Sequence, residues 1–99
     1  MGREQSLKLA ITVSSGSGTG TVISTWDTCY WLRVHPVGES DTYTLQVKDA
    51  DGFLMLSRTS QLGTFSEKIE MSLGIMRTIA ISSASADGQF LCHFDLHHD

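Results

Sequence analysis

The residue types that bind zinc in proteins gather toward the end of the chain, with two further examples upstream. They are Cys29, His35, Cys92, His93, His97 and His98. Thiolate sulfur and imidazole nitrogen are ligands that zinc prefers, but no pair here has the spacing of a zinc finger. In an extended strand Cys92 and His93 point to opposite faces, so one ion could not readily bind both. The sequence therefore favours buried, reduced cysteines and exposed histidines over a metal or cofactor site.

Two other motifs begin like functional sites but lack their remaining parts. Asp49-Ala50-Asp51-Gly52 opens like a calcium loop, yet the further oxygen ligands are missing, and an Asp-Gly pair between strands is typical of a hairpin. Ser17, between two glycines, lies in a flexible Ser/Gly segment and not in the strand-to-helix elbow that holds a nucleophile. We therefore predict that the protein has no catalytic residues and is not an enzyme.

Aromatic side chains are the best candidates for recognition. Trp26, Tyr30 and Trp31 are close in sequence, and tryptophan both stacks on sugars and anchors protein interfaces. At least one of them is expected in the core. Trp31 alternates with Arg33 and His35, so these three share one face of a strand, opposite to Tyr30. If that face is the outer one, they contact a partner or a ligand.

The elements that would hold these residues are strands, because apolar residues recur at every second position. The clearest series run from Leu7 to Val13, from Tyr43 to Val47 and from Phe90 to Leu96. This period describes strands with one buried and one solvated face. The predicted strands are Ser6–Ser14, Thr21–Thr25, Thr28–His35, Thr42–Asp49, Phe53–Arg58, Phe65–Leu73, Ile75–Ile81 and Gly88–Leu96. Seven to eight short strands predict an all-β fold, an antiparallel β-sandwich or a jelly roll.

Turn residues set the predicted boundaries between these strands. Pro36 ends the third strand because it lacks a backbone donor, and Thr59–Thr64 is predicted as a loop centred on Gly63. Ala50–Phe53 and Ala86–Phe90 both place an Asp-Gly turn before an aromatic residue that we expect to be buried. The prediction is one β-sandwich domain over residues 6–96, a polar arm at residues 1–5 and a polar tail at residues 97–99.

Composition excludes several classes of partner. The chain has 99 residues, a formal net charge of -4 and a sequence pI of about 5.4, and its few basic residues are scattered singly. Phosphate-backbone binding needs a clustered basic face, so no nucleic-acid partner is expected. Neither a membrane span nor a signal peptide is predicted, because the apolar runs are short. Serine and threonine make up nearly a quarter of the chain, and faces of small hydroxyls suit permanent assembly.

The order of turns and strands resembles a known family. The matching motifs are the Ser14–Gly20 turn, Tyr43–Val47, Asp49–Gly52, Leu62–Thr64, Ile79–Ile81 and Ala86–Phe90. Together they resemble small β-sandwich structural proteins of tailed bacteriophages, including capsid decoration (cement) proteins and small tail or fibre-attachment proteins. The resemblance covers most of the chain and carries over no catalytic residue.

The resemblance implies an assembly role in a virion that forms in the host cytoplasm. Many copies, often as homotrimers, would bind the major capsid protein or a tail protein, and a cement protein would stabilise the shell. Two alternatives remain open: a tail, baseplate or fibre-attachment component, and a carbohydrate-binding module with tryptophans as stacking platforms. The residues expected at an interface are Arg3 and Gln5 in the arm, with Trp26, Trp31, Arg33 and His35.

Overall fold

The computed structural model describes residues 3–23, 28–72 and 76–98, and these residues form strands and turns without a helix. The eight strands are β1 (Arg3–Val13), β2 (Gly18–Ile23), β3 (Thr28–His35), β4 (Thr42–Lys48), β5 (Leu54–Leu62), β6 (Phe65–Ser72), β7 (Met76–Ser82) and β8 (Gly88–His98). The all-β prediction is confirmed. The segment predicted as a strand from Phe65 to Leu73 is a strand over its described residues, Phe65–Ser72.

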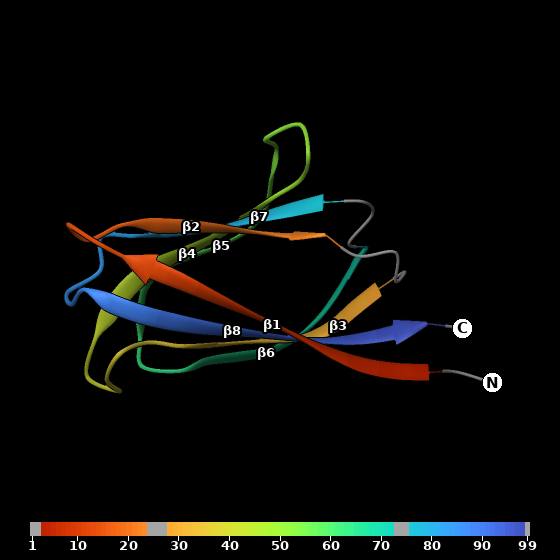
Figure 1. Ribbon diagram of the computed structural model, residues 1–99, viewed down its shortest axis with the longest axis horizontal. Helices are drawn as coiled ribbons and strands as arrows, with labels where there is room; N and C mark the ends of the chain where they lie inside the picture. The colour runs from red at the N-terminus through yellow and green to blue at the C-terminus, as the bar shows by residue number, and fades with distance from the viewer. Residues whose placement is uncertain (1–2, 24–27, 73–75, 99) are drawn as a thin grey trace.

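The strands form two antiparallel four-stranded sheets packed face to face (Figure 1). The strand orders are β1-β8-β3-β6 and β2-β7-β4-β5. Every connection crosses from one sheet to the other except that between β4 and β5, which is a hairpin within one sheet. This eight-stranded, two-sheet arrangement is a jelly roll. The first and last strands of the chain are neighbours, since β1 pairs with β8 along its whole length.

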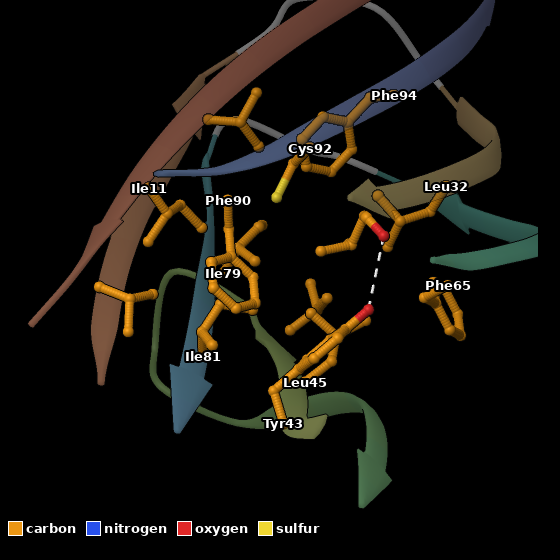
Figure 2. Packing of buried hydrophobic residues seen from close by; sticks show 14 residues of the cluster. Ile11, Leu32, Tyr43, Leu45, Phe65, Ile79, Ile81, Phe90, Cys92 and Phe94 are labelled. Atoms are coloured by element: carbon orange, nitrogen blue, oxygen red, sulfur yellow. Dashed lines mark hydrogen bonds between the residues drawn. The ribbon is translucent and has the colours of Figure 1, made fainter. Parts of the chain in front are cut away.

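The core lies between the two sheets and follows the predicted alternation (Figure 2). Tyr43, Leu45 and Val47 of β4 are fully buried, and Phe90 of β8 packs edge-on against the Tyr43 ring with centroids 5.2 Å apart. The Tyr43 hydroxyl donates a 2.8 Å hydrogen bond to the Gly63 carbonyl, and burial raises its pKa to about 12. The buried cluster comprises Ile11, Val13, Val22, Leu32, Val34, Tyr43, Leu45, Val47, Phe65, Ile79, Ile81, Phe90, Cys92 and Phe94.

Cys92 belongs to this core as a free thiol. Burial raises its pKa to about 12, because a thiolate would have to give up its hydration. The prediction of a buried, reduced cysteine that packs as a small apolar group is confirmed for Cys92. The Cys29 side chain lies outside the described part of the chain.

The ends of the domain extend further than the alternation indicated. β1 begins at Arg3, not Ser6, and β8 continues to His98, because the backbones of these segments pair with each other. The predicted polar arm is therefore part of the sheet from Arg3 onward. Pairing needs only backbone groups, so an apolar pattern that stops at Leu7 does not mark the end of the strand.

A second correction concerns the loop predicted at residues 59–64, because β5 continues to Leu62. The pairing with β4 shifts register between Tyr43 and Leu45, where Ser60 adopts a positive φ of 53°. A bulge of this kind places an extra residue in one strand without ending it. The turn itself is confined to Gly63 and Thr64, and Gly63 has a φ of 66°.

Candidate interaction surface

The outer side of the β1-β8-β3-β6 sheet carries the aromatic and basic residues that the sequence singled out. Leu32 and Val34 of β3 are fully buried, so Trp31, Arg33 and His35 point away from the core. This confirms the predicted alternation and shows that the face of β3 with Trp31 is the outer one. We call this surface the charged face. Its described residues are Ser6, Lys8, Trp31, Arg33, His35, Ser66, Lys68, Leu91, His93 and Asp95.

Strand register places these residues in two rows across the sheet. In one row, Lys8 of β1 lies opposite His93 of β8, which lies opposite Arg33 of β3. In the next row, Ser6 lies opposite Asp95, and Trp31 has Asp95 and Lys68 as its partners on either side. Residues directly opposite one another in antiparallel strands are close enough to interact. The sheet therefore brings together basic side chains from three strands, next to the row that contains Trp31.

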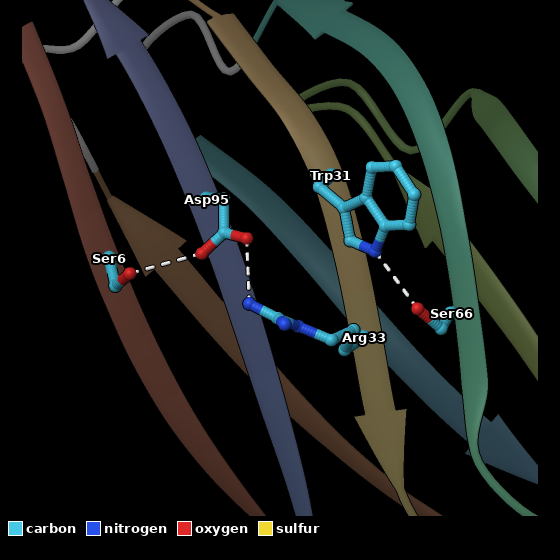
Figure 3. A network of polar contacts seen from close by, with 5 residues as sticks. All are labelled: Ser6, Trp31, Arg33, Ser66 and Asp95. Atoms are coloured by element: carbon cyan, nitrogen blue, oxygen red, sulfur yellow. Dashed lines mark hydrogen bonds and ion pairs between the residues drawn. The ribbon is translucent and has the colours of Figure 1, made fainter.

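A set of polar contacts holds this face in one arrangement (Figure 3). One carboxylate oxygen of Asp95 accepts a 3.0 Å hydrogen bond from the Ser6 hydroxyl, and the other lies 2.6 Å from Nη2 of Arg33. The indole N–H of Trp31 donates a 2.9 Å hydrogen bond to the Ser66 hydroxyl of β6. The contacts involve all four strands, so the face is ordered before any partner arrives.

Two histidines extend the face toward the β3–β4 turn. The rings of His35 and His93 meet edge to face, with centroids 5.3 Å apart. Loss of hydration, followed by the positive charge of His35, Lys8 and Arg33, lowers the pKa of His93, while Asp95 opposes the shift. His93 therefore resists protonation at this position.

His35 also contacts the turn between the sheets. Its Nδ1 lies 3.3 Å from the Thr64 hydroxyl, and Thr64 donates both its hydroxyl and its backbone N–H to the Glu39 carboxylate. The Thr64 hydroxyl and N–H hydrogen bonds lower the pKa of Glu39, with a smaller contribution from His35. This group fixes the end of β3 next to the charged face.

The outer side of the β2-β7-β4-β5 sheet has a different composition, and we call it the hydroxyl face. Thr21 lies opposite Thr78, and Thr44 opposite Ser82. Apart from Lys48 at the end of β4 and the exposed Leu62 at the end of β5, its described side chains are uncharged and mostly short. They are Thr19, Thr21, Thr44, Gln46, Ser57, Thr78, Ala80 and Ser82.

The β4–β5 hairpin presents a third surface that the sequence reasoning missed. Phe53 is 71% exposed, Leu54 54% and Met55 40%, and the hairpin projects beyond the sheets (Figure 1). The expectation of a buried aromatic is confirmed at Phe90 but wrong at Phe53, since the turn before Phe53 is a hairpin while that before Phe90 crosses to the other sheet. The loss of alternation from Phe53 to Leu56 is the signal that could have revealed it.

The hairpin predicted from the Asp-Gly pair is confirmed, and its first aspartate holds the loop. Oδ1 of Asp49 accepts 2.9 Å hydrogen bonds from the backbone N–H groups of Asp51 and Phe53. Gly52, with a φ of 86°, donates its N–H to the Asp49 carbonyl at 3.0 Å. This carboxylate therefore orders its own loop. The second motif acts across the molecule instead, because Asp87 accepts hydrogen bonds from the N–H groups of Ser15 and Gly16.

The remaining candidates fall partly outside these surfaces. Trp26 lies outside the described residues. Arg3 and Gln5 are paired through their backbones with His98 and Leu96, and their side chains are outside the described part. Cys92 and His93 point to opposite sides of β8, as expected.

The described side chains contain no pocket and no group of three His, Cys, Asp or Glu residues placed to hold a metal ion. None of the described segments forms a helix able to cross a membrane.

Comparison with known proteins assigns no family to this chain. No protein-family model and no curated protein matches this chain. Among solved structures, the chain is similar to one described as the structure of infectious bursal disease virus Gx strain, with 9% sequence identity and a TM-score of 0.35. The match covers 98% of this chain and 30% of that one, so the chain spans less than a third of its length.

Proposed function

We propose that this protein is a non-enzymatic structural component of a virus particle, specifically a capsid decoration (cement) protein of a tailed bacteriophage. Two features support the proposal. Its motifs resemble those of small structural proteins of tailed phages, and its eight strands form a jelly roll, an architecture used by viral capsid domains and by lectins. A jelly roll is compatible both with capsid assembly and with sugar binding. The composition of its outer surfaces is what favours one role over the other.

The charged face is the observation on which the proposal depends. Trp31, Arg33 and Asp95 are already held by hydrogen bonds across four strands, so little side-chain entropy is lost when a partner covers them. Tryptophan and arginine are the residue types that most often dominate binding energy at protein interfaces. A rigid surface with this composition is suited to a protein neighbour.

A cement role follows physically if several copies act together. One small domain contacts a limited area, but a symmetric homotrimer that touches several neighbouring shell subunits gains avidity, because later contacts are intramolecular. Many individually weak contacts then resist outward pressure on the shell. A tail or baseplate position would use the same surfaces with the stacking symmetry of the tail.

Cosedimentation with expanded, undecorated capsids tests this function. The wild-type chain should sediment with capsids, and the double variant Trp31→Ala/Lys8→Glu should do so at least about tenfold less tightly, as expected for an interface anchor. Thr78→Ala on the hydroxyl face is the matched control and should bind as the wild type does. The wild-type chain could also stay in the supernatant when capsids are sedimented, and again when phage tails are sedimented. That result would overturn the proposal.

A carbohydrate-binding role is the second candidate, favoured by the position of Trp31. Its indole N–H is engaged by Ser66, and the ring lies on the solvent side of β3 (Figure 3). Aromatic faces of this kind stack on sugars. Binding on a glycan array that disappears in Trp31→Ala, together with no binding to capsids, would favour this function over assembly.

A further inference from the structure

We propose that the tip of the β4–β5 hairpin docks onto the charged face of a second copy of this chain. The tip is defined here as Asp49–Met55. This inference rests on the assembly role proposed above and names the partner of the charged face. It predicts a head-to-tail contact, in which each copy supplies one hairpin and one face.

The tip has the properties of an interface anchor. Three consecutive apolar side chains, Phe53, Leu54 and Met55, are exposed by 71%, 54% and 40%. Large apolar side chains that are exposed together at one loop of a small domain are candidates for an interaction site. The Asp49 hydrogen bonds hold the loop in place, so its docking would cost little conformational entropy.

The tip also carries negative charge beside its apolar residues. Asp51 is exposed, and its carboxylate accepts no hydrogen bond from the described residues. Asp49 uses one of its carboxylate oxygens within the loop. A partner for this tip should therefore combine an apolar or aromatic surface with nearby cations.

The charged face offers that combination in a protein that is acidic as a whole. Lys68 lies opposite Trp31, Arg33 and Lys8 lie in the neighbouring row of the sheet, and Asp95 is the single acidic side chain among the described residues of this face. Asp95 is occupied by Arg33 and Ser6. Leu91, which is 47% exposed, adds an apolar contact on the same face. The chain as a whole has a formal net charge of -4, so a basic surface exists only where its basic side chains gather, as they do on this face.

The fold requires this contact to be made between copies. The hairpin extends from the β2-β7-β4-β5 sheet and projects away from the β1-β8-β3-β6 sheet, which carries the charged face (Figure 1). A hairpin therefore cannot reach the face of its own chain. Because the two contacting surfaces differ, the contact is heterologous, and it closes into a ring when the rotation between copies allows. A homotrimer is one such ring.

Light scattering on the full chain, combined with two complementary variants, tests the inference. The wild type should exceed the monomer mass of 10.8 kDa, and its association should weaken as salt rises. The tip variant Phe53→Ser and the face variant Trp31→Ala/Lys8→Glu should each weaken association by at least about tenfold. Leu62→Ser is the matched control, because Leu62 is 62% exposed on β5 but lies outside the tip.

Mixing the two variants gives the sharpest result. The tip variant retains a face and the face variant retains a tip, so one productive contact remains, and the mixture should form a one-to-one dimer that does not grow further. A wild-type chain that is monomeric at every concentration, a mixture that stays monomeric, or an equal loss in Leu62→Ser would overturn the inference. Urea unfolding of each variant confirms that the substitutions leave the domain folded.

The same samples separate this inference from the proposed function. A chain that self-associates through tip and face but ignores capsids and tails overturns the virion role and supports the contact. A strictly monomeric chain that sediments with capsids supports the virion role and overturns the contact.

Discussion

The two outer faces of the sandwich are built from strands with the same alternation, yet they differ in how their side chains interact. On the charged face, Asp95 links β1 to β3, and Trp31 links β3 to β6. On the hydroxyl face, the side chains of Thr21, Thr44 and their neighbours make no such links among the described residues. Its strands are joined by backbone pairing and by the core beneath them.

This difference indicates that order on the charged face is not a requirement of the fold. The hydroxyl face covers the same core with mostly short, uncharged side chains, so a stable sheet does not need a network of charged ones. Ordering an arginine and a tryptophan at the surface costs side-chain entropy, which their hydrogen bonds must offset. The needs of the fold therefore do not account for the residues of the charged face, and the following substitutions test how far the two faces differ.

Removing the cation that Asp95 contacts should have the largest effect. Arg33→Ala leaves a carboxylate whose side chain is only 21% exposed, so we expect a loss of about 1 to 2 kcal/mol in the free energy of unfolding. Gln46→Ala on the hydroxyl face should change it by less than about 0.5 kcal/mol. Urea unfolding measures both, and equal losses would remove the contrast between the faces.

Removing the acceptor of the Trp31 indole should have a smaller effect. Ser66→Ala abolishes the 2.9 Å hydrogen bond, and the expected loss is about 0.5 to 1 kcal/mol. Ser57→Ala is a matched control, because Ser57 also lies on an edge strand but faces the other way. An unchanged urea midpoint in Ser66→Ala would show that this bond does not order the indole in solution.

The histidine pair should give the charged face a pH dependence that the hydroxyl face lacks. The pKa of His93 is lowered from 6.5 in the fold, so the unfolded chain binds its proton more tightly. Stability should therefore fall as the pH drops below about 6.5 and stop falling below the lowered pKa of the folded state.

The variant His93→Gln isolates this contribution. It should flatten the plot of unfolding free energy against pH in that window, where the carboxylates of the chain are still largely ionised. The reference is the slope of the same plot for the wild-type chain, in which His35, Lys8, Arg33 and Asp95 act on the pKa of His93. Identical slopes for wild type and variant would show that His93 titrates normally.

The smallest effect is expected on the hydroxyl face itself. Thr21→Val replaces an exposed hydroxyl with a methyl group in a strand, and it should shift the free energy of unfolding by no more than about 0.5 kcal/mol. A loss greater than that in urea unfolding would mean that this face is ordered by its hydroxyls as the charged face is by Asp95.

Much of the fold was predictable because it depends on a local property. A period of two assigns Leu45, Phe90 and Cys92 to the inside and places Trp31 on the face of its strand opposite Leu32, and the structure agrees. Backbone pairing follows no such rule. It extends β1 to Arg3 and β5 to Leu62, beyond the ends of the apolar patterns.

The candidate site was less predictable, because its contacts join residues that are distant in sequence. Ser6 and Asp95 are 89 positions apart, and Trp31 and Ser66 are 35 apart. The sequence indicated that Trp31, Arg33 and His35 share a face, but not which strands lie beside them. Phe53 was misplaced for the same reason, since its exposure depends on the path of the chain after the turn.

Three features of the fold could be inferred from local sequence patterns: the strand character of the chain, its division into buried and solvated positions, and the hairpin at Asp49–Gly52. These follow from alternation and turn chemistry, which act between near neighbours. The strand order, the two contrasting faces and the exposure of the hairpin tip became known from the three-dimensional structure alone. Strand order sets which outward-facing residues become neighbours, and that is a property of pairing between distant segments.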